Sequence, residues 1–149
     1  MQSLTAALPP GAVVSVDTVT FIYYVEAAPR YLEVVRPFFE VLAAGQFRAA
    51  TSVITLTEIA VGPLQRGRPD VADDYELLIR SYPHLRVLDV DPAVARLAAE
   101  LRARERLGLA DSLQVAAALE ADATVFVTND LGLARLRTPR VVILDTLLG

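Results

Sequence analysis

The chain has 149 residues, a length typical of a single domain that buries its own core. It contains no cysteine, which excludes disulfides and thiolate zinc sites, and its formal net charge of −4 argues at first against a nucleic-acid partner. Hydrophobic residues make up 54% of the chain and the mean hydropathy is +0.41, as in proteins whose parallel strands are buried on both faces.

Short β-branched runs alternate with helical segments along the chain, which is the pattern of βαβ units. The predicted strands cover residues 12–16, 49–53, 87–90, 124–128 and 141–144. Each run has turn or cap residues nearby. The order of the segments predicts an α/β fold around a mainly parallel sheet.

The segments between the strands read as helices. Apolar residues recur at helical spacing from Leu32 to Leu42, and Asp91-Pro92 is an N-cap followed by proline at the first helical position. The predicted helices cover residues 30–44, 55–65, 71–82, 92–106 and 112–121.

No stretch of the sequence predicts a membrane span. The longest apolar run, residues 11–25, is interrupted by Asp17, whereas a span needs about 20 apolar residues. The first basic residue is Arg30, so we expect no secretory signal. The expectation is a single cytoplasmic domain over residues 1–149.

Four carboxylates each follow a strand at the junction with the next helix: Asp17, Glu58, Asp111 and Asp130. In an open α/β sheet these junctions face one crevice, where ligands bind. Four carboxylates there would repel one another, and oxygen ligation is what Mg²⁺ or Mn²⁺ prefers. The arrangement predicts a metal-dependent site that cleaves phosphoesters. These four residues also account for the whole net charge of −4, so bound cations would make nucleic-acid binding easier.

The three aspartates have a structural alternative, because aspartate is a favoured N-cap of helices. This alternative is weaker for Asp17, since residues 18–22 are rich in β-branched side chains and start a helix poorly. Before Asp130, a buried strand ends in Thr128 and Asn129. These two polar residues can orient carboxylates or metal-bound water, or they can serve turn chemistry alone.

Glu58 has the strongest structural alternative. Thr55 and Glu58 match a capping box, in which the glutamate reaches back to the amide of the N-cap residue. The local pattern favours this role. The position of Glu58 after the second predicted strand favours the crevice instead.

Four motifs in this order carry a family resemblance: VDT at 16–18, TEI at 57–59, LADSL at 109–113 and TND at 128–130. The chain resembles the PIN-domain ribonucleases and, in length and motif order, the VapC-type toxins of bacterial toxin–antitoxin pairs. The similarity extends over essentially the whole chain. Gln114 departs from it, because the family usually has an aliphatic residue there; we expect it to affect helix packing or a contact near the site.

The resemblance implies a three-layer α/β/α sandwich with a sheet of about five strands. It also implies that Asp17, Glu58, Asp111 and Asp130 bind one or two Mg²⁺ or Mn²⁺ ions and that the protein hydrolyses RNA phosphodiesters. The three aspartates would be direct ligands, and Glu58 would complete a second position or hold the attacking water.

The partners implied are an RNA substrate, a cognate antitoxin that covers the crevice, and a second copy of the chain. We expect the aromatic pairs at 23–24 and 38–39 to hide apolar surface in assembly. Two alternatives stay open: a PIN nuclease of RNA processing without an antitoxin, and an inactive PIN-like RNA-binding domain. The intact set of four carboxylates argues against the second.

Overall fold

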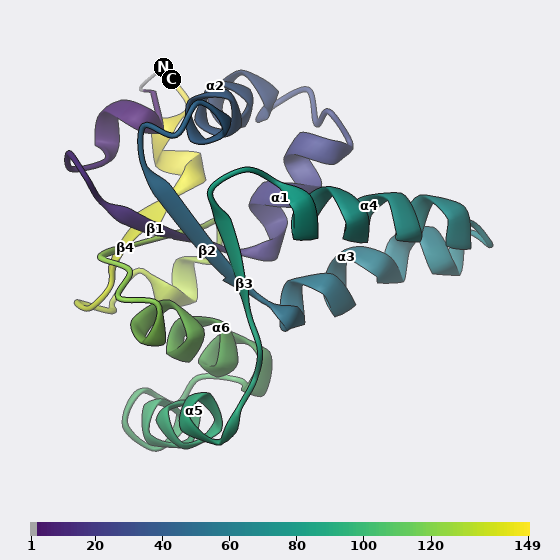
Figure 1. The fold of residues 1–149 in the computed structure, drawn as a ribbon. Coiled ribbons are helices and arrows are strands. Elements are labelled where there is room, and N and C mark those ends of the chain that lie inside the picture. The colour runs from purple at the N-terminus through teal and green to yellow at the C-terminus, as the bar shows by residue number, and fades with distance from the viewer. Residues whose placement is uncertain (1–2) are drawn as a thin grey trace.

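The computed structural model describes residues 3–149 and contains a five-stranded sheet whose strands are all parallel (Figure 1). The strands are β1 Val13–Val16, β2 Arg48–Ser52, β3 Leu85–Leu88, β4 Val125–Thr128 and β5 Arg140–Ile143. Their order across the sheet is β3-β2-β1-β4-β5. The predicted fold class is confirmed, and each predicted strand is present with its ends shifted by at most two residues.

Helices connect the strands along the chain. The α-helices are α1 Thr18–Val25, α2 Leu32–Ala43, α3 Val53–Gln65, α4 Pro69–Ser81, α5 Pro92–Glu105 and α6 Leu109–Glu120. Three short 3₁₀ helices are η1 Thr5–Ala7, η2 Leu131–Leu133 and η3 Leu144–Leu147. None of the helices in residues 3–149 combines the length and the apolar character needed to span a membrane.

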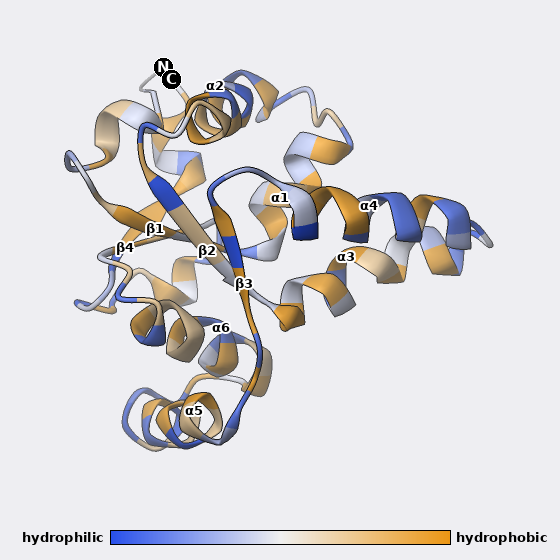
Figure 2. Ribbon diagram, viewed as in Figure 1, coloured by the Kyte–Doolittle hydropathy of each residue, from blue (hydrophilic) through white to orange (hydrophobic). Residues whose placement is uncertain are grey.

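The helices cover both faces of the sheet and form three layers. Helices α1 to α4 lie on one face, and α5 and α6 lie on the other (Figure 1). Strand β4 shows how one sequence serves two cores: Val125 and Val127 pack toward α1 and α2, whereas Phe126 packs toward α5 and α6. Side chains alternate across a strand, so a strand buried on both faces is apolar throughout. Figure 2 shows apolar colours along most of the sheet, with polar residues on β2 and β3, and both polar and apolar residues along α4.

Helix α1 corrects one expectation. The β-branched run after Asp17 was expected to start a helix poorly, yet α1 begins at Thr18. The side chain of Asp17 caps it, and Thr18, Thr20 and Phe21 are buried. Tertiary packing therefore outweighs a weak helix propensity in this segment.

One of the two aromatic pairs corrects a second expectation, that these rings hide apolar surface in assembly. Phe38 and Phe39 are both 0% exposed in the single chain, so they have no apolar surface left for assembly. Tyr24 stacks on Phe39 with ring centroids 4.4 Å apart, and Tyr23 stacks on Tyr31 at 3.9 Å. These rings stabilise the contact between α1 and the start of α2. Tyr23 and Tyr24 stay half-buried, so the expectation of assembly is wrong for the pair at 38–39 alone.

Candidate carboxylate site

The candidate site lies where β1 and β4 end side by side. Asp17 directly follows β1, and Asp130 lies two residues beyond β4. The backbone N–H of Asp17 donates to the carbonyl of Val127 at 2.9 Å, which ties the first aspartate to the neighbouring strand. The chain builds the sheet from β1 outward to β3 and then returns to β4 and β5 on the other side of β1. Ligands of open α/β sheets bind at such a reversal of strand order.

The other two carboxylates come from helices on opposite faces of the sheet. Glu58 lies five residues into α3, and Asp111 lies in the first turn of α6. The pKa of Asp111 is raised to about 6, first by burial and then by the negative charges of Asp130 and Asp17. The charge of Glu58 adds a smaller contribution of the same sign. The structure thus brings the four predicted carboxylates into one cluster, which we call the carboxylate quartet.

Two hydrogen bonds hold the carboxylate of Asp17. Its Oδ1 accepts from the backbone N–H of Thr18 at 2.8 Å, and its Oδ2 accepts from the hydroxyl of Thr128 at 2.7 Å. Burial raises the pKa of Asp17, and these two hydrogen bonds oppose that rise. The charges of Glu58 and Asp130 raise the pKa further. Asp17 therefore caps α1 and belongs to the quartet at the same time.

The capping box predicted for Thr55 and Glu58 is wrong, because α3 begins at Val53. Ser52 is the N-cap, and its hydroxyl accepts from the backbone N–H of Ile54 at 3.2 Å. The carboxylate of Glu58 instead accepts from the hydroxyl of Thr18 at 2.7 Å. Glu58 is thereby directed toward the end of β1.

Asp111 and Asp130 differ in their local roles. Helix α6 begins at Leu109 with Gly108 as its N-cap, so the interpretation of Asp111 as an N-cap is wrong. Asp130 caps η2, where its Oδ1 accepts from the backbone N–H of Gly132 at 2.8 Å. Capping therefore explains the position of Asp130. Asp111 caps no helix, so capping does not offset the unfavourable free energy of its charge.

Thr128 links the two strand ends that carry the aspartates. Its hydroxyl donates to Asp17 and accepts from the backbone N–H of Asp130 at 3.1 Å. The Thr128 side chain is buried, so both contacts are shielded from water. This geometry fits the predicted role of Thr128 in orienting a carboxylate.

Asn129 orients a different group from the one predicted. Its amide nitrogen, with two hydrogens to donate, lies 3.1 and 3.2 Å from the hydroxyls of Tyr23 and Tyr31 and 3.2 Å from the carboxylate of Asp145. Its carbonyl oxygen accepts from the backbone N–H of Asp145 at 2.9 Å. Within residues 3–149 these hydrogen bonds reach no carboxylate of the quartet, so Asn129 fastens η3 to α1 beside the site.

Asp145 is a fifth carboxylate near these strand ends that sequence reasoning missed. It lies two residues beyond β5, as Asp130 does beyond β4, so the same strand-end signal could have indicated it. Tyr31 donates to its carboxylate at 2.6 Å. Hydrogen bonds from Tyr31 and Asn129 hold the pKa of Asp145 below its usual value, which marks it as a structural anchor.

The donor set of the quartet suits a hard divalent cation, because carboxylates offer only oxygen ligands. In residues 3–149 no ion pair within 4.0 Å joins an arginine to any of the four, so the protein leaves their repulsion unbalanced. No three Asp, Glu or His side chains of this part of the chain are already placed to hold one ion. The chemistry and the charge of the quartet suit a metal ion. Its side chains lie near one another but do not yet form a coordination shell.

Because the pKa of Asp111 is raised, removing its charge should increase the stability of the fold by an amount that depends on pH. The folded-state pKa of about 6 lies above the ordinary aspartate pKa of 3.8, so ionisation lowers the stability of the metal-free protein as the pH rises from about 4 to about 6. Asp111→Asn should therefore gain Tm relative to the wild type over this range. Solvent screening limits the gain to about 1 kcal/mol, which is roughly 2–4 °C for this length.

Thermal melts in a chelating buffer from pH 4 to 8 measure this difference. Asp89→Asn is the matched control, because Asp89 is an exposed carboxylate in the loop after β3, outside the quartet. The control should follow the wild type at every pH. A Tm difference between Asp111→Asn and the wild type that does not change with pH would contradict the raised pKa of Asp111.

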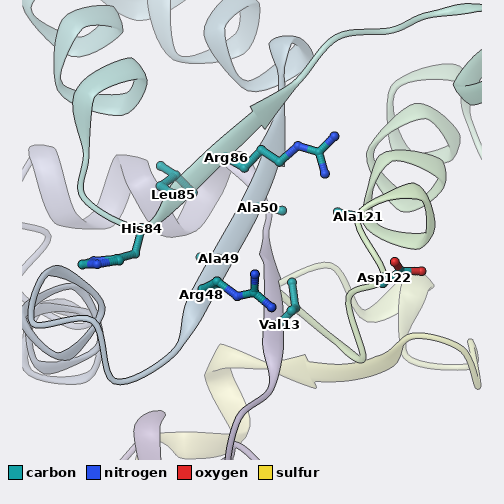
Figure 3. A pocket seen from close by; sticks show the side chains of 9 residues that line it. All are labelled: Val13, Arg48, Ala49, Ala50, His84, Leu85, Arg86, Ala121 and Asp122. Atoms are coloured by element: carbon teal, nitrogen blue, oxygen red, sulfur yellow. The ribbon is translucent and has the colours of Figure 1, made fainter.

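A separate hollow of about 460 Å³ lies at the amino ends of β1, β2 and β3, at the edge of the sheet opposite to the quartet. Figure 3 shows the guanidinium groups of Arg48 and Arg86 turned toward α6, whereas His84 points away from it. None of the residues that line this hollow belongs to the quartet. The acidic cluster and this hollow are therefore different places on the molecule.

Several solved structures of similar fold come from toxin–antitoxin systems. VapBC2 from Rickettsia felis, bound to a DNA fragment from their promoter, is 20% identical with a TM-score of 0.70, and the match covers 88% of this chain and 98% of that chain. DNA-bound VapBC from Salmonella typhimurium is 24% identical with a TM-score of 0.70, covering 89% and 98%. VapBC-5 from Mycobacterium tuberculosis, a member of the VapBC family of toxin-antitoxin systems, is 26% identical with a TM-score of 0.55, covering 90% and 98%.

Comparison of the sequence with protein-family profiles identifies the family. No curated protein matches the chain. The profile of the PIN domain matches residues 14–139, a span that runs from β1 to the loop before β5 and contains the whole quartet. The fold and this match agree with the resemblance seen in the sequence motifs, and the chain belongs to the PIN domain family.

Proposed function

We propose that the protein is a Mg²⁺- or Mn²⁺-dependent endoribonuclease, which acts in the cytoplasm as the toxin of a toxin–antitoxin pair. One observation carries the proposal: four carboxylates from four segments gather at the reversal of strand order, with no arginine paired to them in residues 3–149. Such a cluster destabilises a protein that has no use for it. Membership of the PIN domain family supports nuclease chemistry at this cluster.

The residues of the quartet divide the work. Asp17, Asp111 and Asp130 would hold the metal, and Glu58 would complete a second position or hold the attacking water. A bound divalent cation supplies a lowered pKa for water and stabilisation of the charge that develops on the phosphate. Thr128 fixes Asp17 at 2.7 Å, so this carboxylate is already oriented before any ligand binds.

The rim of the quartet offers apolar contacts to a partner. Leu109 and Leu131 are 60% and 70% exposed, and each lies within two residues of a quartet aspartate. A partner that covers these leucines would lie beside the segments that carry Asp111 and Asp130. The likeness to VapBC proteins supports a cognate antitoxin as partner. We propose that it binds over these leucines, and that the toxin itself is a homodimer.

Expression in a bacterial host tests the toxin assignment. The wild type alone should arrest growth and cleave RNA, and co-expression with the product of the neighbouring short reading frame should suppress both effects. Asp130→Asn should be harmless alone while still binding that product, because its shape is unchanged. A harmless wild type that cleaves RNA in vitro would instead favour a PIN nuclease of RNA processing. A wild type without cleavage under any divalent metal would contradict the nuclease.

A further inference from the structure

A buried polar network lies next to Glu58. It is formed by five side chains that are each at most 5% exposed: Thr18, Thr51, Ser52, Thr55 and Gln114. Buried polar groups cost free energy unless their hydrogen-bonding capacity is used. The direction of each hydrogen bond therefore follows from the groups at the two ends of the network.

One end of the network is a backbone carbonyl. The hydroxyl of Thr51 donates to the carbonyl oxygen of Val16 at 2.9 Å, and this oxygen can only accept. Thr51 has no second hydrogen, so it must accept at its 2.8 Å contact with Thr55. The hydroxyl hydrogen of Thr55 is therefore committed to Thr51.

The other end is the carboxylate of Glu58. The hydroxyl of Thr18 donates to its Oε1 at 2.7 Å, and an ionised carboxylate can only accept. Thr18 then has no hydrogen for Thr55, whose hydroxyl lies 3.0 Å away. Thr55 has none for Thr18 either, so both hydroxyl oxygens need a donor from elsewhere.

Gln114 supplies that donor. Its amide nitrogen lies 2.8 Å from the hydroxyl of Thr55 and 3.3 Å from the hydroxyl of Thr18. Its carbonyl oxygen accepts from Ser52 at 2.6 Å, which fixes the orientation of the amide. A primary amide offers two hydrogens from one nitrogen, whereas an aliphatic side chain offers none. The glutamine is thus the group that completes a network with acceptors at both ends.

We propose that Gln114 is a positioning residue of the carboxylate quartet. Its amide N–H donates to the oxygen of the Thr18 hydroxyl. The hydrogen of that hydroxyl therefore stays directed at Glu58. The Glu58 side chain is exposed and rotates about several bonds, so a fixed donor selects one of its orientations. Glu58 is thereby held ready for the metal or the water. The expected effects on metal binding and cleavage rest on the proposed function, whereas the effect on the orientation of Glu58 does not.

Three variants test the proposal: Gln114→Met, Thr18→Val and the double variant. Methionine keeps the length of glutamine without its donors, so Thr18 becomes free to donate to Thr55 and release Glu58. We expect Mn²⁺ affinity, measured by calorimetry, to fall about tenfold and kcat for RNA to fall about 10- to 100-fold, with KM unchanged. The double variant should be no worse than Thr18→Val, because both changes act through one hydroxyl. Additive losses would overturn the proposal.

Thr51→Val is the matched control. It removes a buried hydroxyl from the same network but from the arm that ends on the Val16 carbonyl. We expect a lower Tm, with Mn²⁺ affinity and kcat as in the wild type. An equal loss of kcat in Thr51→Val and Gln114→Met would mean that the network only stabilises the fold, which contradicts a positioning role.

Two structural readouts separate this inference from the proposed function. If the wild type neither binds Mn²⁺ nor cleaves RNA, the proposed function fails, and a crystal structure of Gln114→Met still decides the inference: Glu58 should leave Thr18. An unmoved Glu58 would overturn it. If Gln114→Met does not fold, the side-chain amide resonances of Gln114 serve instead. Introducing Glu58→Gln into the wild type should shift these resonances. Introducing it into Thr18→Val should leave them unchanged, and equal shifts in the two proteins would overturn the proposal.

Discussion

Asp17→Asn is expected to lose more than about a hundredfold of the RNA cleavage rate while keeping its fold. Loss of a group that only orients a metal ligand costs about 10- to 100-fold, so loss of a proposed ligand should cost more. The fold should survive because asparagine can keep both local contacts. Its oxygen can accept from the backbone N–H of Thr18, and its nitrogen can donate to the hydroxyl of Thr128, where Asp17 now accepts.

Initial rates on a structured RNA with Mn²⁺, together with circular dichroism, measure this effect. Asp89→Asn again serves as the control, because it removes one negative charge from the molecule without touching the quartet. The control should cleave at the wild-type rate. A well-folded Asp17→Asn that retains the wild-type rate would remove Asp17 from the site, and an equal loss in the control would point to net charge instead.

The fold, and the four carboxylates that come together in it, could both be predicted from the sequence for the same reason. Strands buried on both faces leave long apolar runs, as in β4, and the chain becomes polar abruptly where such a strand ends. Asp17 and Asp130 mark two of these ends. In a parallel sheet all strands end at the same edge, so a one-dimensional pattern indicates which side chains meet in space.

The details that failed depend on where helices begin, which the local sequence leaves open. A capping box at Thr55 is plausible from four residues alone, yet α3 begins at Val53 because Ser52 at the end of β2 serves as the cap. Asp111 fails as a cap for the same reason, since α6 begins before it. Shifts of two or three residues are enough to change a capping side chain into a free one.

The contacts of Asn129 and Gln114 were out of reach for a different reason. Asn129 binds Asp145, sixteen positions away in the sequence, and Gln114 binds Thr18 across 96 positions. Such pairs depend on how the layers of the sandwich pack. The sequence indicated only that Gln114 replaces an aliphatic residue near the site. The structure adds the donor directions, which turn that departure into a testable role.

The second large effect is a reversal in the order of stability when metal is added. Without metal, Asp111→Asn should melt above the wild type at pH 7.5, because it removes a charge that burial, and then the neighbouring carboxylates, make unfavourable. Metal at a hundredfold excess over its Kd stabilises the protein that binds it by about 2.7 kcal/mol, or roughly 5–10 °C for this length. The wild type should therefore melt above Asp111→Asn in Mn²⁺.

The crossing of the two melting curves is more informative than either shift alone. A structural role for Asp111 would make the variant less stable under both conditions. Binding of Mn²⁺ at some other acidic patch would raise both Tm values equally and leave their order unchanged. Opposite orders with and without metal are expected when the Asp111 charge is unfavourable in the metal-free protein, through burial and repulsion, and a cation bound at the quartet stabilises it. Differential scanning calorimetry in chelator and in Mn²⁺ measures both orders on the same samples, and parallel curves would exclude the quartet as the metal site.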